Sequence, residues 1–200
     1  MKKKGLLIAA LLLIVLGIAF TSTNAYTFAK GYFLYKMDSK AEPVSKPAAV
    51  PEASVKHNAA PELYPVRPKQ GEEMGTLYIP KLKASLPIYH GTDEDELKKG
   101  VGHYAKSVLP GENDNSVLSG HRDTVFRRLG EVGVGDLLIV KTSAGQFTYK
   151  VRKVRIVDKN DRTVIVPKPR ATLTVSTCYP FSYIGSAPQR YILIAYLLHK

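Results

Sequence analysis

The sequence predicts a mainly β domain that closes into a barrel or a sandwich, preceded by one membrane-spanning helix. Short apolar or alternating segments recur from residue 76 onward, and turns rich in Pro and Gly separate them. A long uncharged stretch near the N-terminus predicts the membrane helix. Predicted strands occupy residues 76–79, 86–89, 115–120, 137–142, 146–157, 171–178 and 190–198. With few helices between them, these segments indicate seven or eight strands in one closed β architecture.

The first 37 residues predict a membrane anchor and its flank. Three lysines at residues 2–4 precede an apolar run, and no charge occurs at residues 5–29. A helix of that length reaches roughly 37 Å, enough to cross a hydrocarbon core of about 30 Å. A cleaved signal peptide is the alternative, because small residues at 23–25 suit cleavage. Aromatic residues at 26–35 favour a retained anchor, and the lysines at the front place the N-terminus inside and the main domain outside the cytoplasm.

A linker and a working domain follow the anchor. Residues 38–71 are rich in Pro, Ala, Lys and Glu, and their prolines interrupt both helix and sheet. This composition predicts an extended, semi-rigid spacer that holds the domain away from the membrane. Residues 72–200 carry all the predicted strands and form the predicted working domain.

The positive charge is divided between the two halves of this layout. The chain has 29 Lys and Arg against 17 Asp and Glu, a net charge of +12. Residues 72–200 hold 19 basic and 13 acidic side chains, which is +6, so the other +6 lies in the first 71 residues. The domain has no basic helical stripe with interleaved aromatics, which argues against a nucleic-acid partner. Basic faces attracted to an anionic cell envelope are the better interpretation.

Smaller elements are predicted between the strands. Thr92 is the expected N-cap of a short helix with acidic residues in its first turn and Gly100 at its end. Residues 125–132 predict a helical turn or two. A hairpin is expected around residues 143–145, and the apolar alternation slips by one in its second strand, which predicts a β-bulge at Arg152-Lys153.

The single cysteine excludes an intramolecular disulfide and any multi-cysteine metal centre. Side chains alternate between the faces of a strand, so Cys178 shares a face with Thr174 and Ser176 and lies opposite Leu173 and Val175. The cysteine therefore continues a polar row. A buried free cysteine that acts as a small hydrophobe is the alternative interpretation.

Arg190 begins the last predicted strand, which is otherwise strongly apolar. If the last two strands pair antiparallel, Cys178 and Arg190 face each other across the mouth of the loop at 179–189. A guanidinium there favours a thiolate and can stabilise a developing oxyanion. An ordinary surface arginine at a strand end is the alternative.

A nucleophilic cysteine also needs a proton shuttle, and the chain has five histidines. His121 follows a strand and a glycine, at the kind of strand-to-loop boundary that often carries catalytic groups. His90 and His103 stay open as candidates. His57, in the linker, and His199, next to the C-terminus, are poor ones.

Two motifs resemble a known family. Residues 119–123 read Ser-Gly-His-Arg-Asp, and residues 174–181 read Thr-Val-Ser-Thr-Cys-Tyr-Pro-Phe, followed by Arg190 and Tyr191. These motifs resemble the sortases, membrane-anchored cysteine transpeptidases of Gram-positive bacteria, and the likeness covers residues 72–200. The Tyr-Pro-Phe after the cysteine is most similar to class D. The Val-Ser pair before Thr-Cys departs from the Leu-x-Thr-Cys of many relatives.

The resemblance implies a fold, a site and partners. It implies an eight-stranded β-barrel with Cys178 as nucleophile, His121 as general acid/base and Arg190 as the oxyanion or substrate-positioning residue. The expected substrate is a protein with an LPxTG-like sorting signal, cleaved between Thr and Gly through a thioester. The expected acceptor is an amine of a cell-wall precursor or another protein. No cofactor is expected, and the domain would lie on the extracellular face of the cell membrane.

Three alternatives stay open beside this interpretation. Calcium could bind between acidic loops that contain Glu112, Asp114, Asp158 and Asp161, although such carboxylates are more often only solvated. The enzyme could be an extracytoplasmic cysteine endopeptidase that uses water as acceptor. The domain could also be a non-enzymatic envelope-binding module with a structural thiol.

Overall fold

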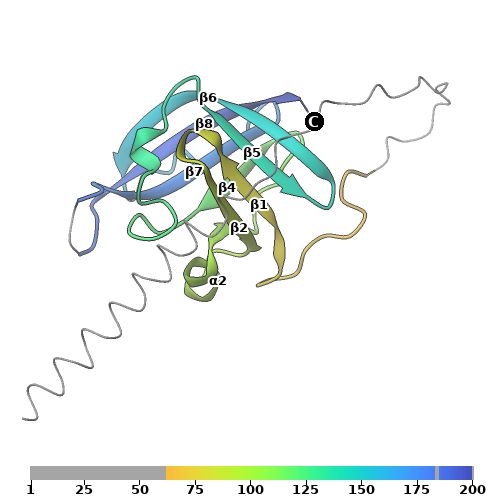
Figure 1. Cartoon of the computed structure of the whole chain (residues 1–200), viewed down its shortest axis with the longest axis horizontal. Helices are drawn as coiled ribbons and strands as arrows, with labels where there is room; N and C mark the ends of the chain where they lie inside the picture. Colours follow the sequence, from red (N-terminus) through yellow and green to blue (C-terminus); the bar gives the residue numbers. More distant parts are fainter. Residues whose placement is uncertain (1–61, 183–184, 200) are drawn as a thin grey trace, which may run out of the picture.

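The eight strands of the domain close into one barrel. The computed structural model describes residues 62–182 and 185–199, and it is drawn in Figure 1. Around the barrel the strands follow the order β1-β2-β3-β4-β7-β8-β6-β5, with β5 pairing back to β1. The strands are β1 (Glu73–Ile79), β2 (Ala84–His90), β3 (Val101–His103), β4 (Asn115–Ser119), β5 (Leu137–Thr142), β6 (Gly145–Asp158), β7 (Thr172–Tyr179) and β8 (Gln189–His199). The predicted eight-stranded β-barrel is confirmed.

Three short helices connect the strands. They are η1 (Pro80–Leu82), α2 (Glu94–Lys99) and η2 (Leu129–Glu131), the first and last of which are 3-10 helices. The predicted cap of α2 is wrong by one residue, because Asp93 and not Thr92 is the N-cap. The Glu96 side chain accepts a hydrogen bond from the Asp93 N–H at 3.0 Å, which completes a capping box.

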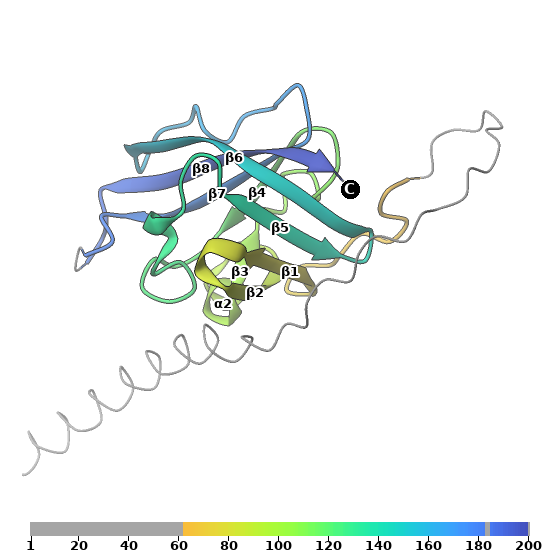
Figure 2. The same ribbon diagram turned by 45° about the horizontal axis from the view of Figure 1, so that its top comes forward.

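The barrel contains two parallel strand pairs among antiparallel ones. Strand β2 pairs with β3, and β4 pairs with β7, both in the parallel sense. The pairs β1–β2, β5–β6 and β7–β8 are antiparallel and join strands that are consecutive in the sequence. A parallel pair brings two C-terminal strand ends to the same edge of the sheet. The ends of β4 and β7 therefore meet at one rim of the barrel; both strands are labelled in Figure 2.

The core fills the barrel with large apolar side chains. Phe126, Phe147 and Tyr149 are its largest fully buried members. The Tyr149 hydroxyl accepts a hydrogen bond from the Gly111 N–H at 2.7 Å, so its polar end is satisfied inside the core. Burial raises the pKa of Tyr149, which keeps the hydroxyl protonated.

Strand β3 is the one strand that the sequence did not predict. It is only three residues long and contains a glycine, so it is too short to display the apolar alternation of a strand.

The predicted spacer contributes to the fold near its end. Tyr64 is 3% exposed, and its hydroxyl donates to the Pro110 carbonyl at 2.6 Å, so this part of residues 62–71 packs on the barrel.

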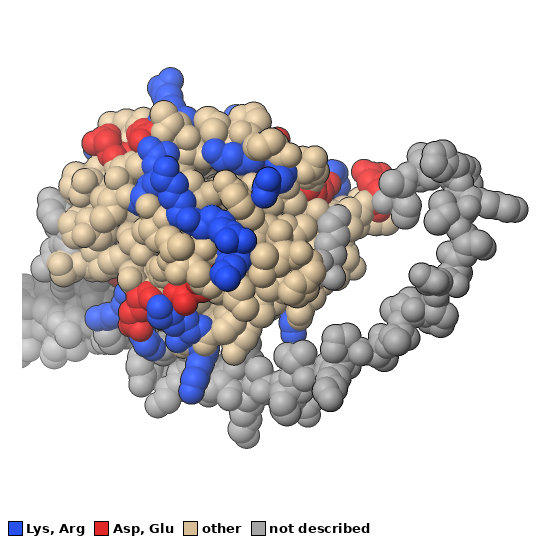
Figure 3. All heavy atoms as spheres, turned by 90° about the horizontal axis from the view of Figure 1, so that it is seen from above, with Lys and Arg blue, Asp and Glu red and all other residues tan. Residues whose placement is uncertain are grey.

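The predicted β-bulge is confirmed. The register between β6 and β8 shifts between Val151 and Lys153. Past the bulge, Arg155 pairs with Ile192 while Arg152 and Lys153 are exposed. Figure 3 shows Lys and Arg side chains in a band across this side of the molecule.

The predicted anchor at 1–37 and most of the predicted linker lie outside the described residues. Within residues 62–182 and 185–199, no helix is long and apolar enough to cross a membrane.

Candidate active site

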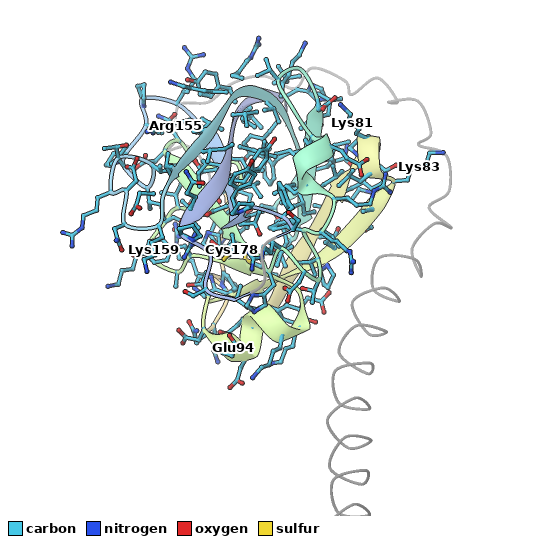
Figure 4. The ribbon with its side chains drawn as sticks, turned by 90° about the vertical axis from the view of Figure 1, so that its left-hand side faces the viewer. Lys81, Lys83, Glu94, Arg155, Lys159 and Cys178 are labelled. Carbon is cyan, nitrogen blue, oxygen red and sulfur yellow. The ribbon has the colours of Figure 1, made fainter. Side chains whose placement is uncertain are left out.

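Three neighbouring strands bring the predicted site residues to one rim of the barrel. His121 follows the end of β4, Cys178 lies near the end of β7, and Arg190 lies at the start of β8. Because β7 pairs parallel with β4 and antiparallel with β8, these three strand ends coincide. Figure 4 shows Cys178 near the middle of this side of the domain, with Glu94 of α2 below it.

Cys178 occupies the face that the sequence alternation predicts. Leu173 and Val175 of β7 belong to the barrel core. Cys178 is on the opposite face, partly exposed, with a free thiol, and Ser176 beside it is also partly exposed. The thiol is therefore accessible to a substrate on the outside of the barrel, which argues against the buried-hydrophobe alternative.

Cys178 and Arg190 are direct partners in the β7–β8 register, so the predicted antiparallel pairing is confirmed. The Arg190 Nη1 donates to two carbonyls of the preceding chain, those of Ala187 at 3.2 Å and Gln189 at 2.9 Å. These bonds hold the guanidinium at the base of the β7–β8 loop. A permanently charged side chain thereby belongs to the residue that pairs with the cysteine across the two strands.

The parallel ladder of β4 and β7 brings His121 towards Cys178. The last ladder pair is Ser119 with Ser176, and His121 and Cys178 each come two residues later. The chains remain bonded past the ladder. The Gly120 N–H donates to the Ser176 carbonyl at 3.2 Å, and the Thr177 hydroxyl donates to the Gly120 carbonyl at 2.8 Å.

Gly120 leaves room for the turn that carries His121. A Cβ at Gly120 would lie 2.7 Å from the ring of Phe126 and 2.8 Å from the Val125 side chain. Such contacts are too close, so a larger residue would displace the turn. The turn folds back through a bond from the Phe126 N–H to the His121 carbonyl at 3.0 Å.

A carboxylate from α2 joins the site, and sequence reasoning did not identify it. The Glu94 Oε2 lies 3.7 Å from the His121 Nε2, and the Glu94 Oε1 lies 3.7 Å from the Lys98 Nζ. The His121 side chain is 34% exposed and that of Glu94 is 62% exposed, so water screens this attraction. The helical pattern identifies Glu94 as a first-turn residue, but its proximity to His121 depends on the tertiary fold.

The other two candidate histidines form a structural pair. His90 and His103 stack with ring centroids 5.1 Å apart, and their Nδ1 atoms are 3.1 Å apart. The His103 Nε2 contacts the Val108 carbonyl at 2.9 Å, so that nitrogen carries the proton. Burial lowers the pKa of His103 to about 4 and also lowers the pKa of His90. His103 pairs with Leu118, within β4, and not with the strand end that leads to His121.

An aromatic cluster supports the loop after Cys178. The ring centroids of Tyr179 and Phe181 are 5.7 Å apart, and those of Phe181 and Tyr191 are 5.3 Å apart. The Tyr191 hydroxyl donates to the Val132 carbonyl at 2.9 Å. The first residues after Cys178 are therefore packed against β8 and the segment that follows η2.

A cavity of about 290 Å³ lies under the β6–β7 connection, between that connection and the loop before β4. Asn115 lines it and donates through Nδ2 to the Val166 carbonyl at 3.0 Å. The Thr174 hydroxyl donates to the Asn115 Oδ1 at 2.7 Å. Buried bonds thus tie the β6–β7 connection to the outer face of β4 and β7.

Each of the four carboxylates considered for calcium already has a hydrogen-bond or ion-pair partner within the protein. Glu112 accepts from the Leu109 N–H and pairs with Arg67, and Asp114 accepts from the Lys168 N–H. Asp158 accepts from the Asn160 N–H, and Asp161 pairs with Arg155. Across the described part of the chain, no group of three or more His, Cys, Asp or Glu side chains is placed to hold a metal ion.

Comparisons with known proteins show the family to which the chain is similar. A family model described as Sortase domain matches residues 77–198. Sortase D of Bacillus subtilis (strain 168) is 54% identical over 128 residues, which cover 64% of this chain and 65% of that protein. Sortase SrtE1 of Streptomyces coelicolor is 31% identical over 129 residues, covering 55% of this chain and 37% of that protein.

Solved structures of sortases also match this chain. The catalytic domain of B. anthracis SrtD matches with a TM-score of 0.58 and 43% identity, over 70% of this chain and 97% of that one. A Clostridium perfringens Sortase D5 transpeptidase matches with a TM-score of 0.61 and 28% identity, over 66% of this chain and 83% of that one. The chain belongs to the sortase family. Its similarity to sortase D and SrtD supports a place in class D.

Proposed function

We propose that this chain is a membrane-anchored cysteine transpeptidase. It cleaves an LPxTG-like sorting signal between Thr and Gly, holds the substrate as a thioester on Cys178, and transfers it to an amino nucleophile of the cell wall. The observation that carries the proposal is the meeting of Cys178, Arg190 and the His121 turn at one rim of the barrel. Membership in the sortase family supports the same chemistry.

The first half of the reaction forms the thioester. The Cys178 sulfur attacks the carbonyl carbon of the threonine, and the oxyanion that develops is stabilised by the Arg190 guanidinium. The C–N bond then breaks. His121, in its protonated form, donates a proton to the departing glycine amine. The acyl group remains on Cys178 and the C-terminal peptide leaves.

The second half releases the product. An incoming amine attacks the thioester carbonyl and gives a proton to His121, which now acts as the base. The C–S bond breaks, and Cys178 regains the thiolate that started the cycle. The new amide joins the sorted protein to its acceptor. No metal takes part in either half of the proposed cycle.

The proposed setting is the outer face of a cell membrane. The uncharged run of residues 5–29, preceded by lysines, supports a single-pass anchor with the catalytic domain outside. Full-length protein with a C-terminal tag should fractionate with membranes and be accessible to external protease. Leu12→Arg with Ile14→Arg should release it from the membrane fraction, and retention of that variant would contradict the anchor.

A peptide assay tests the reaction. The full chain is incubated with an LPxTG-containing peptide and an added amine, and products are identified by mass spectrometry. We expect a transfer product, and a covalent acyl adduct that maps to Cys178 when the reaction is quenched early. Cys178→Ala should abolish both cleavage and transfer. Full activity in that variant would exclude the proposed mechanism.

The same assay separates the main alternative. A cysteine endopeptidase would give the hydrolysis product alone, with no transfer at any amine concentration. A non-enzymatic envelope-binding module would give neither product. Its thiol would also resist a mild alkylating agent in the folded protein, whereas the partly exposed Cys178 should react.

A further inference from the structure

Arg122 links the turn after β4 to the loop after β7. Its Nη1 donates to the Pro180 carbonyl at 2.9 Å, and its Nη2 donates to the Gly185 carbonyl at 2.9 Å. The two carbonyls are five residues apart in sequence, so one guanidinium spans the first half of the loop. The planar fork of Arg suits two directed bonds of this kind.

With these bonds, the segment after β4 and the end of β7 are hydrogen-bonded to each other both before and after His121 and Cys178. The Thr177 hydroxyl bonds to the Gly120 carbonyl, immediately before Cys178 and His121. Arg122 bonds to Pro180 immediately after His121 and two residues after Cys178. The segment with His121 and the segment with Cys178 are therefore joined at both ends, and neither can move apart without breaking a link.

The loop that Arg122 holds also leads to Arg190. Arg190 bonds to the carbonyls of Ala187 and Gln189, in the second half of the loop. The Lys159 N–H donates to the Pro188 carbonyl at 2.9 Å, which fixes the loop near its end. Loosening the first half would thus change the surroundings of both Cys178 and Arg190.

We propose that Arg122 is a positioning residue, which keeps His121 in reach of Cys178 by clamping the β7–β8 loop to the turn after β4. This role rests on the proposed transpeptidase function. Arg122 does not touch the substrate in this scheme. Its loss should lower kcat, because the reacting groups spend less time in the productive geometry, with a smaller effect on KM.

The test compares Arg122→Ala and Arg122→Lys with Arg127→Ala. Arg127 is exposed in the same turn, and its variant removes the same charge. Three quantities are measured on the full chain: hydrogen exchange of the described loop residues 181–182 and 185–187, the rate of Cys178 alkylation by iodoacetamide at pH 7, and kcat and KM for peptide cleavage. Protection of β4 and β7 amides checks that each variant is folded.

For Arg122→Ala we expect faster loop exchange, several-fold slower alkylation and a kcat lowered about tenfold or more. Slower alkylation follows because the imidazole no longer lies where it can accept the thiol proton as the sulfur reacts. Arg122→Lys keeps the charge but lacks the fork, so it should behave like Arg122→Ala. Arg127→Ala should match the wild type.

Equal values for Arg122→Ala and Arg127→Ala would overturn the clamp. Hydrogen exchange and alkylation do not require any peptide to be cleaved. They therefore test whether Arg122 holds the β7–β8 loop even if the transpeptidase assay fails. Conversely, activity that survives Cys178→Ala would remove the proposed function without changing the exchange result.

Discussion

Cys178 and Arg190 are Cα partners at the loop end of the antiparallel β7–β8 pair. This relationship places a positively charged residue directly across from the proposed nucleophile on the neighbouring strand, and it makes Arg190 the first residue to test after Cys178 itself. The Arg190 guanidinium is bonded to the loop carbonyls of Ala187 and Gln189, so its position is set before any substrate binds. A preorganised donor of this kind needs little rearrangement in the transition state.

Arg190→Ala should lower kcat for peptide cleavage by about 10²- to 10³-fold, the usual effect of removing an oxyanion donor. Arg190→Lys should recover little, because an ammonium cannot reproduce the bonds of a planar fork. Steady-state kinetics on a sorting-signal peptide provide the measurement. Cleavage by Arg190→Ala within threefold of the wild type would assign the oxyanion role to another group.

Glu94→Gln should slow cleavage by up to about fivefold at low salt. The carboxylate attracts the protonated His121, which donates to the leaving amine, and an exposed pair of this kind contributes roughly 0.2–1 kcal/mol. The difference from wild type should shrink in 1 M NaCl because of screening. Asp95→Asn, a neighbouring first-turn residue, is the matched control. An effect that is independent of salt would argue against an electrostatic origin.

The free energy of unfolding should fall as the pH drops from 6.5 towards 4. Burial lowers the pKa of His103 from 6.5 to about 4, so in this window the unfolded chain binds a proton that the folded chain does not. The stability from this group is complete above pH 6.5, and about 3 kcal/mol is lost by pH 4.

Denaturant titrations at pH 7, 5.5 and 4 measure this dependence. Carboxylates also titrate there, so the informative quantity is the difference in slope between wild type and His103→Gln. His103→Gln should be less stable at pH 7 but flatter with pH. His199→Gln, an exposed histidine on β8, should keep the wild-type slope. Parallel curves for wild type and His103→Gln would show that His103 is not the titrating group.

Tyr64→Phe should destabilise the domain by about 1–2 kcal/mol. The buried hydroxyl donates to the Pro110 carbonyl and lies 2.9 Å from the Thr142 Oγ1, so the variant leaves buried partners unsatisfied. Burial raises the pKa of Tyr64 to about 12, and the hydroxyl therefore remains a donor at all physiological pH values. Thermal unfolding, with the partly exposed Tyr104→Phe as a control, measures the change. A shift equal to the control would mean that this bond contributes nothing net.

Chelation should leave activity unchanged. The proposed cycle uses only the side chains of His121, Cys178 and Arg190, so EDTA should not lower the rate of peptide cleavage and added calcium should not raise it. Inductively coupled plasma analysis of the purified chain and cleavage rates in EDTA or calcium provide the measurement. A rise of several-fold with calcium, abolished in Asp114→Asn, would instead support the calcium alternative between the acidic loops.

Local patterns in the sequence were sufficient for much of the fold. Alternation places Cys178 on the outer face of β7, because side chains on a strand point to opposite faces in turn. The pairing of Cys178 with Arg190 follows from two consecutive strands joined by a short loop. The bulge between Val151 and Lys153 is visible as a slip in the apolar alternation. Each of these features depends on residues close together in the chain.

The remaining features depend on contacts between distant segments. The tertiary structure alone shows strand β3 and the hydrogen bonds between Gly120 and β7. It also shows the contacts that Glu94 and Arg122 make with distant segments. By itself, the sequence determined the strand faces, the polar position of Cys178 and its pairing with Arg190. Only the tertiary structure decided that β4 lies parallel to β7, which brings His121 towards Cys178. The physical reason is that a parallel pair needs a long crossover, and closure of the whole barrel, more than any local pattern, sets its register.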